Sequence, residues 1–189
     1  MAKQGLLIVL SAPSGAGKAT LLQRMRQRGA VLNHPVSVTT RQPRADEAEG
    51  REYYFKTEAE FDALLEQGAF VEWAAVHGAR YGTLRSELER YMVAGSDVVL
   101  ELDVQGMRNL RQMGLPVVAV FLLPPDLHEL ERRIRGRGQN DEASIALRMQ
   151  NARDEIAAKN EYDHVIVNDD LDEAARLFER VLEIERARR

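Results

Sequence analysis

The chain has 189 residues, 44% of them hydrophobic, which is enough to bury the core of one domain. Its 26 basic and 30 acidic residues give a formal net charge of −4, which argues against general binding to nucleic acid. The sequence contains no cysteine, and no apolar run approaches the length of a membrane span or a secretion signal. We therefore expect a cytoplasmic protein without disulfides that binds neither nucleic acid nor a membrane.

The first predicted element is an apolar strand over 6–10, followed by a glycine-rich loop and a helix over 18–28. The loop matches the P-loop pattern G-x-x-x-x-G-K-[ST] at Gly17 and Lys18, but Ala12 stands at the first glycine and Ala19 at the Ser/Thr position. Glycines let backbone N–H groups turn around phosphate oxygens, and the lysine adds positive charge. The predicted nucleotide-binding residues are Ser11, Ala12, Pro13, Ser14, Gly15, Ala16, Gly17, Lys18, Ala19 and Thr20. An ordinary glycine turn between strand and helix is the alternative.

Further strand-like runs occur at 36–38, 98–102, 117–122 and 165–167, separated mostly by helical patterns. This alternation predicts an α/β protein with a parallel sheet covered by helices. Thr57, Asp126 and Asp170 each precede a glutamate by three residues, the spacing of a capping box at a helix start.

Two segments depart from this alternation. Residues 40–81 contain a polar loop, short strands over 53–55 and 70–76 and a helix over 58–67, which predicts an inserted lobe. The run 132–140 interleaves arginines with glycines between two helices, which indicates a hinged lid. We therefore divide the chain into a core (1–39, 82–131 and 155–189), an insertion (40–81) and a lid (132–154).

Several polar residues suggest anion binding in the insertion and lid. Arg41 and Arg44 follow a short strand, and their planar donors suit bidentate contact with one phosphate. Tyr53 and Tyr81 offer phenol donors for the same phosphate. A solvated basic loop and ring-packed tyrosines are the alternatives.

Carboxylates in or at the end of apolar strands indicate a second candidate binding site. Glu72 lies in a mostly apolar strand, and Glu101 and Asp103 end the most hydrophobic one. At the carboxyl end of a parallel strand either of the latter two could hold Mg²⁺, directly or through water, or contact a substrate. A helix N-cap is the alternative for Asp103.

Taken together, these segments resemble guanylate kinase of the bacterial type, a P-loop nucleoside monophosphate kinase. The resemblance covers almost the whole chain, in the order of the family, and is carried by SAPSGAGK, SVTTRQPR, EW, YGT, ELDVQG, RRIRGRG and VIVNDDLD. The resemblance implies a P-loop core, a GMP-binding lobe, a lid over ATP, and phosphorylation of GMP and dGMP by ATP with Mg²⁺. Lys18, Arg41, Arg137 and Arg148 would be catalytic. The GMP phosphate would contact Arg41, Arg44, Tyr53 and Tyr81. The guanine would contact Ser37, Glu72, Thr83 and Asp103, with Glu101 also on the acceptor side. The ATP phosphates would contact Arg133, Arg137 and Arg148, and Asn168 would lie near adenine.

Ala19 is the departure from the family pattern, because the usual Mg²⁺-binding hydroxyl is absent. Thr20 does not replace it, since one residue along a helix is rotated by about 100°. We expect an active enzyme with weakened handling of Mg²⁺ or ATP. Two alternatives remain: a catalytically impaired domain that binds nucleotide or protein, and a P-loop kinase with another acceptor. The sequence does not indicate an oligomeric state.

Overall fold

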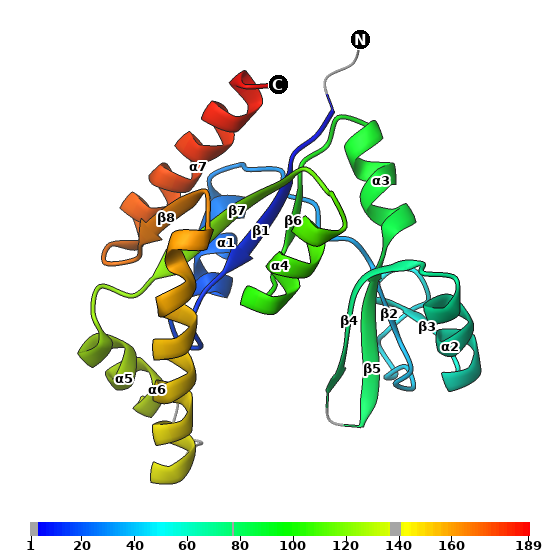
Figure 1. The fold of residues 1–189 in the computed structure, drawn as a ribbon, viewed down its shortest axis with the longest axis horizontal. Coiled ribbons are helices and arrows are strands. Elements are labelled where there is room, and N and C mark those ends of the chain that lie inside the picture. Colours follow the sequence, from blue (N-terminus) through cyan, green and yellow to red (C-terminus); the bar gives the residue numbers. More distant parts are fainter. Residues whose placement is uncertain (1–3, 77, 137–140) are drawn as a thin grey trace.

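A computed structural model describes residues 4–76, 78–136 and 141–189. Its core is a four-stranded sheet in the order β6 (Val98–Leu100), β1 (Leu7–Ser11), β7 (Val117–Leu123) and β8 (His164–Val167). All neighbouring strands in this sheet are parallel. The predicted α/β class with a parallel sheet is therefore confirmed (Figure 1).

Helices cover both faces of the sheet because β1 is buried throughout and its apolar side chains alternate between two cores. One core contains Ile8 and Leu10 with the buried sides of α1 (Lys18–Gln27) and α7 (Leu171–Ala187). The other contains Leu7 and Val9 with α3 (Arg85–Val93) and α4 (Val104–Gln112). This packing holds the carboxyl end of β1, where the P-loop begins, at a fixed place.

A second four-stranded sheet forms the lobe, in the order β3 (Tyr53–Phe55), β2 (Ser37–Thr39), β5 (Ala79–Leu84) and β4 (Phe70–Val76). Helix α2 (Glu58–Glu66) packs on it, with Phe61 stacked on Phe70 at 4.5 Å between ring centroids. The prediction that the strand at 36–38 joins the parallel sheet is wrong. It forms β2 of the lobe instead, because Val38 is buried with Phe61 and Phe70.

The strand β5 crosses the predicted boundary between 81 and 82, and β2 ends at the boundary between 39 and 40. The division into core, insertion and lid stays a proposal. Figure 1 draws the lobe with β2 to β5 and α2 on one side of the parallel sheet, and α5 and α6 on the other.

The predicted lid, 132–154, falls on a pair of helices, α5 (Leu127–Arg135) and α6 (Glu142–Ala157), which the short η1 (Ala158–Glu161) follows. The two helices share a small core of their own, made of Leu130, Ile134, Ile145, Met149 and Ala152. The expected interruption at 132 is wrong, because α5 continues to residue 135. Intrahelical ion pairs to Glu129 and Glu131 accompany this extra turn.

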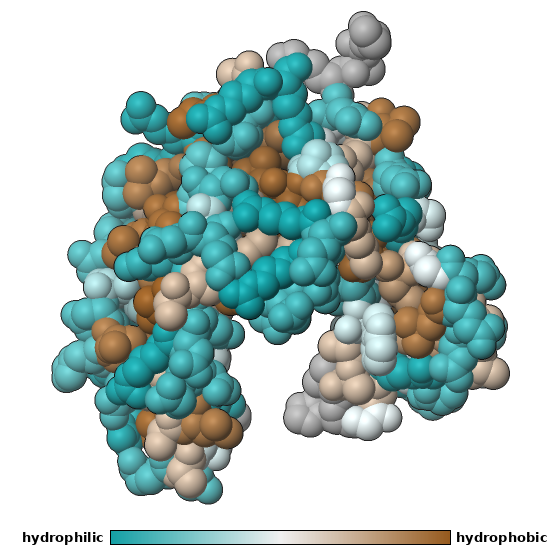
Figure 2. Space-filling view, viewed as in Figure 1, coloured by the Kyte–Doolittle hydropathy of each residue, from teal (hydrophilic) through white to brown (hydrophobic). Residues whose placement is uncertain are grey.

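The three predicted helix starts are confirmed. Thr57 forms the complete capping box with Glu60, while Asp126 and Asp170 each accept one backbone N–H from the glutamate three residues on. None of the helices in the described ranges is both long and apolar enough to cross a bilayer. Figure 2 shows a broad hollow between the lid helices and the lobe.

Candidate active site

The P-loop connects the end of β1 to the start of α1. Gly15 and Gly17 have φ of 97° and 96°, in the left-handed region that favours glycine. A Cβ on Gly17 would lie 2.5 Å from Nδ2 of Asn168, so no larger residue fits there without displacing that amide. In the first turn of α1, Ala19 and Thr20 are exposed. The loop thus has the backbone shape of a phosphate cradle, and its Ser/Thr position opens to solvent without a hydroxyl.

Asn168 joins the P-loop to the end of β8. Its side chain is buried and donates from Nδ2 to the carbonyl of Ala16 at 2.7 Å, while its backbone N–H donates to Leu123 at 2.8 Å. A cavity of about 310 Å³ adjoins this bond and is lined by Gly15, Gly17, Thr20, Arg133, Asn168, Asp169 and Leu171. The structure therefore brings Asn168, Arg133 and Thr20, all predicted on the ATP side, to one cavity at the P-loop. Their contacts with ATP stay a prediction.

Lys18 is surrounded by carboxylates. Its Nζ lies 3.8 Å from Oε2 of Glu101. Burial lowers the pKa of Lys18, and the negative charges of Glu101, Glu155 and Asp103 act in the opposite direction. Glu155, on α6, was not predicted from the sequence, because a glutamate on a polar helix face gives no signal of its own. Its own pKa is raised by burial and by the charge of Asp103.

Asp103 is the N-cap of α4, and its Oδ1 accepts the N–H of Gly106 at 2.7 Å. The alternative interpretation of Asp103 as a helix N-cap is therefore confirmed. The cap also fixes the carboxylate at the carboxyl end of β6, where its charge raises the pKa of Lys18 against the effect of burial and adds to the burial that raises the pKa of Glu72. Its role in binding guanine or Mg²⁺ stays a prediction.

A cavity of about 400 Å³ between the lobe and the parallel sheet collects most of the predicted acceptor residues. Its lining includes His34, Ser37, Tyr53, Glu72, Thr83 and Glu101. Glu72 and Thr83 are paired across β4 and β5, and the Thr83 hydroxyl donates to Oε1 of Glu72 at 2.5 Å. Burial raises the pKa of Glu72. A half-buried carboxylate held by one hydroxyl is a strong acceptor aimed at the cavity.

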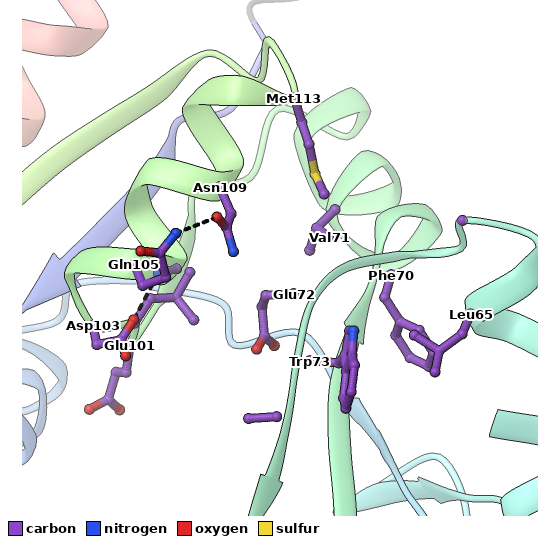
Figure 3. Close-up of a pocket in the computed structure, with 14 residues that line it drawn as sticks. Leu65, Phe70, Val71, Glu72, Trp73, Glu101, Asp103, Gln105, Asn109 and Met113 are labelled. Atoms are coloured by element: carbon purple, nitrogen blue, oxygen red, sulfur yellow. Dashed lines mark hydrogen bonds between the residues drawn. The ribbon is translucent and has the colours of Figure 1, made fainter. Parts of the chain in front are cut away.

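A larger groove of about 550 Å³ runs between α4 and β4. Figure 3 draws Glu72 and Glu101 pointing into the same space below α4, whereas Trp73 and Phe70 lie on the other side of β4. Gln105 and Asn109 form the α4 wall and are joined by a 2.8 Å hydrogen bond. Glu72 and Glu101 therefore border both hollows.

The predicted phosphate clamp is assembled only in part. The guanidinium of Arg41 lies 5.5 Å from the ring centroid of Tyr53, and the rings of Tyr53 and Tyr81 are 5.7 Å apart. Arg41 donates to both carboxylate oxygens of Glu47 at 2.8 and 2.9 Å, and this bonding lowers the pKa of Glu47. The backbone N–H of Arg44 donates to the same carboxylate at 2.8 Å. Glu47 was missed because it stands among exposed acidic residues of a polar loop, yet it shapes this turn.

The structure shows the positions of only some of the arginines predicted to contact the ATP phosphates. Arg133 donates from Nε to Glu129 at 2.8 Å, and its side chain lines the cavity beside the P-loop. Arg132 and Arg133 together lower the pKa of Glu129 to about 2. Arg148 is half-buried on α6. The predicted residue Arg137 lies outside the described residues.

This geometry agrees with what comparison with known proteins finds. The model of the family described as guanylate kinase matches residues 4–185. The chain belongs to the guanylate kinase family.

Individual guanylate kinases match over nearly the full length. The chain is 49% identical to guanylate kinase of Synechococcus sp. (strain JA-3-3Ab), covering 96% of this chain and 83% of the relative. It is 44% identical to guanylate kinase of Cereibacter sphaeroides, covering 100% and 90%. The crystal structure of guanylate kinase from Anaplasma phagocytophilum superimposes with a TM-score of 0.67 at 34% identity, covering 97% of this chain and 87% of that one.

Proposed function

We propose that this chain transfers the γ-phosphoryl group of ATP to GMP or dGMP, producing ADP and GDP or dGDP. The observation that carries this proposal is the half-buried carboxylate of Glu72, held by Thr83 in a cavity next to the P-loop cleft. Guanine presents two adjacent donors, N1–H and the 2-amino group, and one carboxylate accepts from both. Adenine lacks that pair, so binding AMP would leave the acceptor unpaired at a cost of about 1–3 kcal/mol.

The remaining acceptor residues complete the recognition of GMP. Ser37 lines the same cavity, and its hydroxyl is a donor suited to O6 of guanine. Arg41, Tyr53 and Tyr81 form one cluster at the lobe, suited to the phosphate. We propose that the phosphate competes with Glu47 for Arg41, so the clamp forms when GMP arrives. No residue is needed to read the ribose 2′-OH, which agrees with use of dGMP.

Catalysis would rest on positioning and on charge. The attacking group is a phosphate oxygen whose second pKa is about 6, so it is largely ionised at pH 7 and needs no general base. Lys18 at the P-loop would stabilise charge on the transferred group, together with Arg148 and Arg137 of the lid. Arg41 would hold the acceptor in line.

Mg²⁺ is proposed to accompany ATP. Glu101 and Asp103 offer carboxylate oxygens beside Lys18, but Ala19 supplies no hydroxyl. Within the described ranges no group of three or more His, Cys, Asp or Glu side chains is placed to hold a metal alone. Such a partial set fits Mg²⁺, which keeps several waters and takes its other ligands from substrate phosphates. When bound, Mg²⁺ supplies charge neutralisation on those phosphates.

The test is a coupled assay of ADP release with ATP and Mg²⁺, comparing GMP, dGMP, AMP and UMP as acceptors. We expect rapid turnover with GMP and dGMP only. Turnover with AMP or UMP at a similar rate would refute the role given to Glu72. GMP binding by calorimetry without turnover would instead indicate a disabled P-loop.

A further inference from the structure

Glu101 lies between the two substrate sites. It follows β6, the strand next to β1, so it stands beside the P-loop at the carboxyl end of the parallel sheet. Its carboxylate is 3.8 Å from Nζ of Lys18 on one side. On the other side it lines the acceptor cavity with Ser37 and Glu72. Of the side chains lining that cavity in the described structure, Glu101 is the one with an ion pair to the P-loop lysine.

The ion pair is of a kind that a nucleotide can break. The two side chains are 25% and 38% exposed, and ion pairs with this much solvent contact contribute little to stability. Lys18 is the less exposed of the two partners, so a nearby anion stabilises its charge. The triphosphate of ATP, bound in the cradle, carries far more negative charge than one carboxylate. It therefore draws Lys18 away from Glu101.

The loss of Lys18 changes the acceptor side of the cleft. Figure 3 draws Glu101 and Glu72 pointing into the same space below α4, and once Lys18 has moved to the phosphates Glu101 would face that space without its cation. Burial raises the pKa of Glu72 and the charge of Asp103 acts in the same direction, so the wall of the groove at Glu101 carries three carboxylates. Such a wall favours any N–H or O–H donor that enters the cavity. The 2-amino group of GMP is such a donor.

We propose that Glu101 is a positioning residue that couples the two nucleotide sites: it holds Lys18 in the ligand-free protein and turns to GMP once ATP has taken Lys18. The inference rests on the proposed function and adds to it an order of events within the site. Because coupling between sites is reciprocal, GMP also strengthens binding of ATP. An exposed ion pair supports a coupling of about two- to fivefold in Kd.

The test is isothermal titration calorimetry of GMP in EDTA, with and without a saturating non-hydrolysable ATP analogue. We expect the analogue to tighten GMP binding about two- to fivefold in the wild type. In Glu101→Gln, the ratio of the two Kd values should fall to about one, with both ligands still binding. Glu155→Gln is the matched control. It removes a carboxylate that also faces Lys18 but does not line the acceptor cavity, so the coupling should persist.

Three outcomes would overturn the proposal. A Kd ratio of one in the wild type, with GMP and the analogue each binding, refutes the coupling and leaves the proposed function intact. Equal loss of coupling in Glu101→Gln and Glu155→Gln would show that net charge around Lys18 is sufficient. Coupling that appears only when Mg²⁺ replaces EDTA would assign Glu101 to the metal rather than to Lys18. If GMP itself does not bind, the proposed function fails first.

Discussion

Replacing Glu72 by glutamine tests the central claim about acceptor selection. In Glu72→Gln the side chain keeps its length and one oxygen, so the Thr83 hydroxyl can still donate to it. The second oxygen becomes an NH₂ donor, which faces one of the two guanine donors. The variant thus loses one charge-assisted hydrogen bond and weakens the other.

The size of the effect follows from these two changes. Hydrogen bonds to charged groups contribute about 1.5–3 kcal/mol, roughly twice the neutral value. Losing one and weakening the other gives about 2–4 kcal/mol, or about 30- to 1,000-fold in kcat/KM for GMP. The KM for ATP should not change. The glutamine amide can pair with N1 and the 6-amino group of adenine, so the preference for GMP over AMP should shrink further.

The stability of Glu72→Gln should be equal to or greater than that of the wild type, although its activity falls. Burial raises the pKa of Glu72 above its ordinary value of 4.5 in the folded state. The unfolded chain therefore ionises this group more readily, and the glutamate costs stability as pH rises above its unfolded value through its folded pKa. Glutamine removes this cost. We expect the Tm of the variant at pH 7 to equal or exceed that of the wild type.

The assay is steady-state kinetics with GMP and with AMP at saturating ATP, together with thermal unfolding at pH 5 and 7. Glu66→Gln, at the exposed end of α2 in the same lobe, is the control and should behave as wild type. A loss of less than about threefold for GMP in Glu72→Gln, with its Tm unchanged, would refute the reasoning because a typical neutral hydrogen bond, at about 1 kcal/mol, already corresponds to about fivefold.

Three further changes test the P-loop and the fold. Ala19→Ser adds a hydroxyl at an exposed position, so kcat/KM for ATP should rise several-fold at limiting Mg²⁺; no gain at any Mg²⁺ concentration would contradict this. Gly17→Ala forces a left-handed φ on alanine and a Cβ 2.5 Å from Asn168, so calorimetry should show ATP binding at least about tenfold weaker and GMP binding unaltered. Asp97→Ala leaves the buried N–H of Leu6 without its acceptor and removes the ion pair to Arg186, so urea unfolding should show a free energy of unfolding lower by about 1–3 kcal/mol. We expect kcat to stay unchanged; a change in kcat would contradict a purely structural role for Asp97.

The sequence predicts those parts of the fold in which each residue has one structural role, such as burial in a strand or capping of a helix. The apolar run of β1 and the glycines after it can only be a buried strand followed by a tight loop, and the structure shows both. Thr57 with Glu60 predicts the start of α2 because both halves of a capping box are present. The parallel sheet follows from the alternation of such elements.

Other parts of the fold and site could not be predicted, because their residue patterns fit more than one structural role. The strand β5 was not predicted because its residues alternate weakly, since Thr83 lines the acceptor cavity rather than a hydrophobic core. The strand predicted at 36–38 forms at 37–39, but three residues do not specify which sheet they join. Glu47 and Glu155 look like solvated surface glutamates in the sequence, and only the folded chain places them next to Arg41 and Lys18.

The contact between α5 and the P-loop has a mechanical consequence. A Cβ on Gly15 would come within 3.1–3.2 Å of Ile134 and Leu130, so the helix lies directly against the loop. The same two side chains belong to the small core that joins α5 to α6. The core that joins α5 to α6 is therefore in packing contact with the phosphate loop at Gly15. A cavity-forming change such as Met149→Ala would loosen this core, and the disturbance would reach the P-loop through Ile134 and Leu130 although Met149 lines none of the described nucleotide cavities.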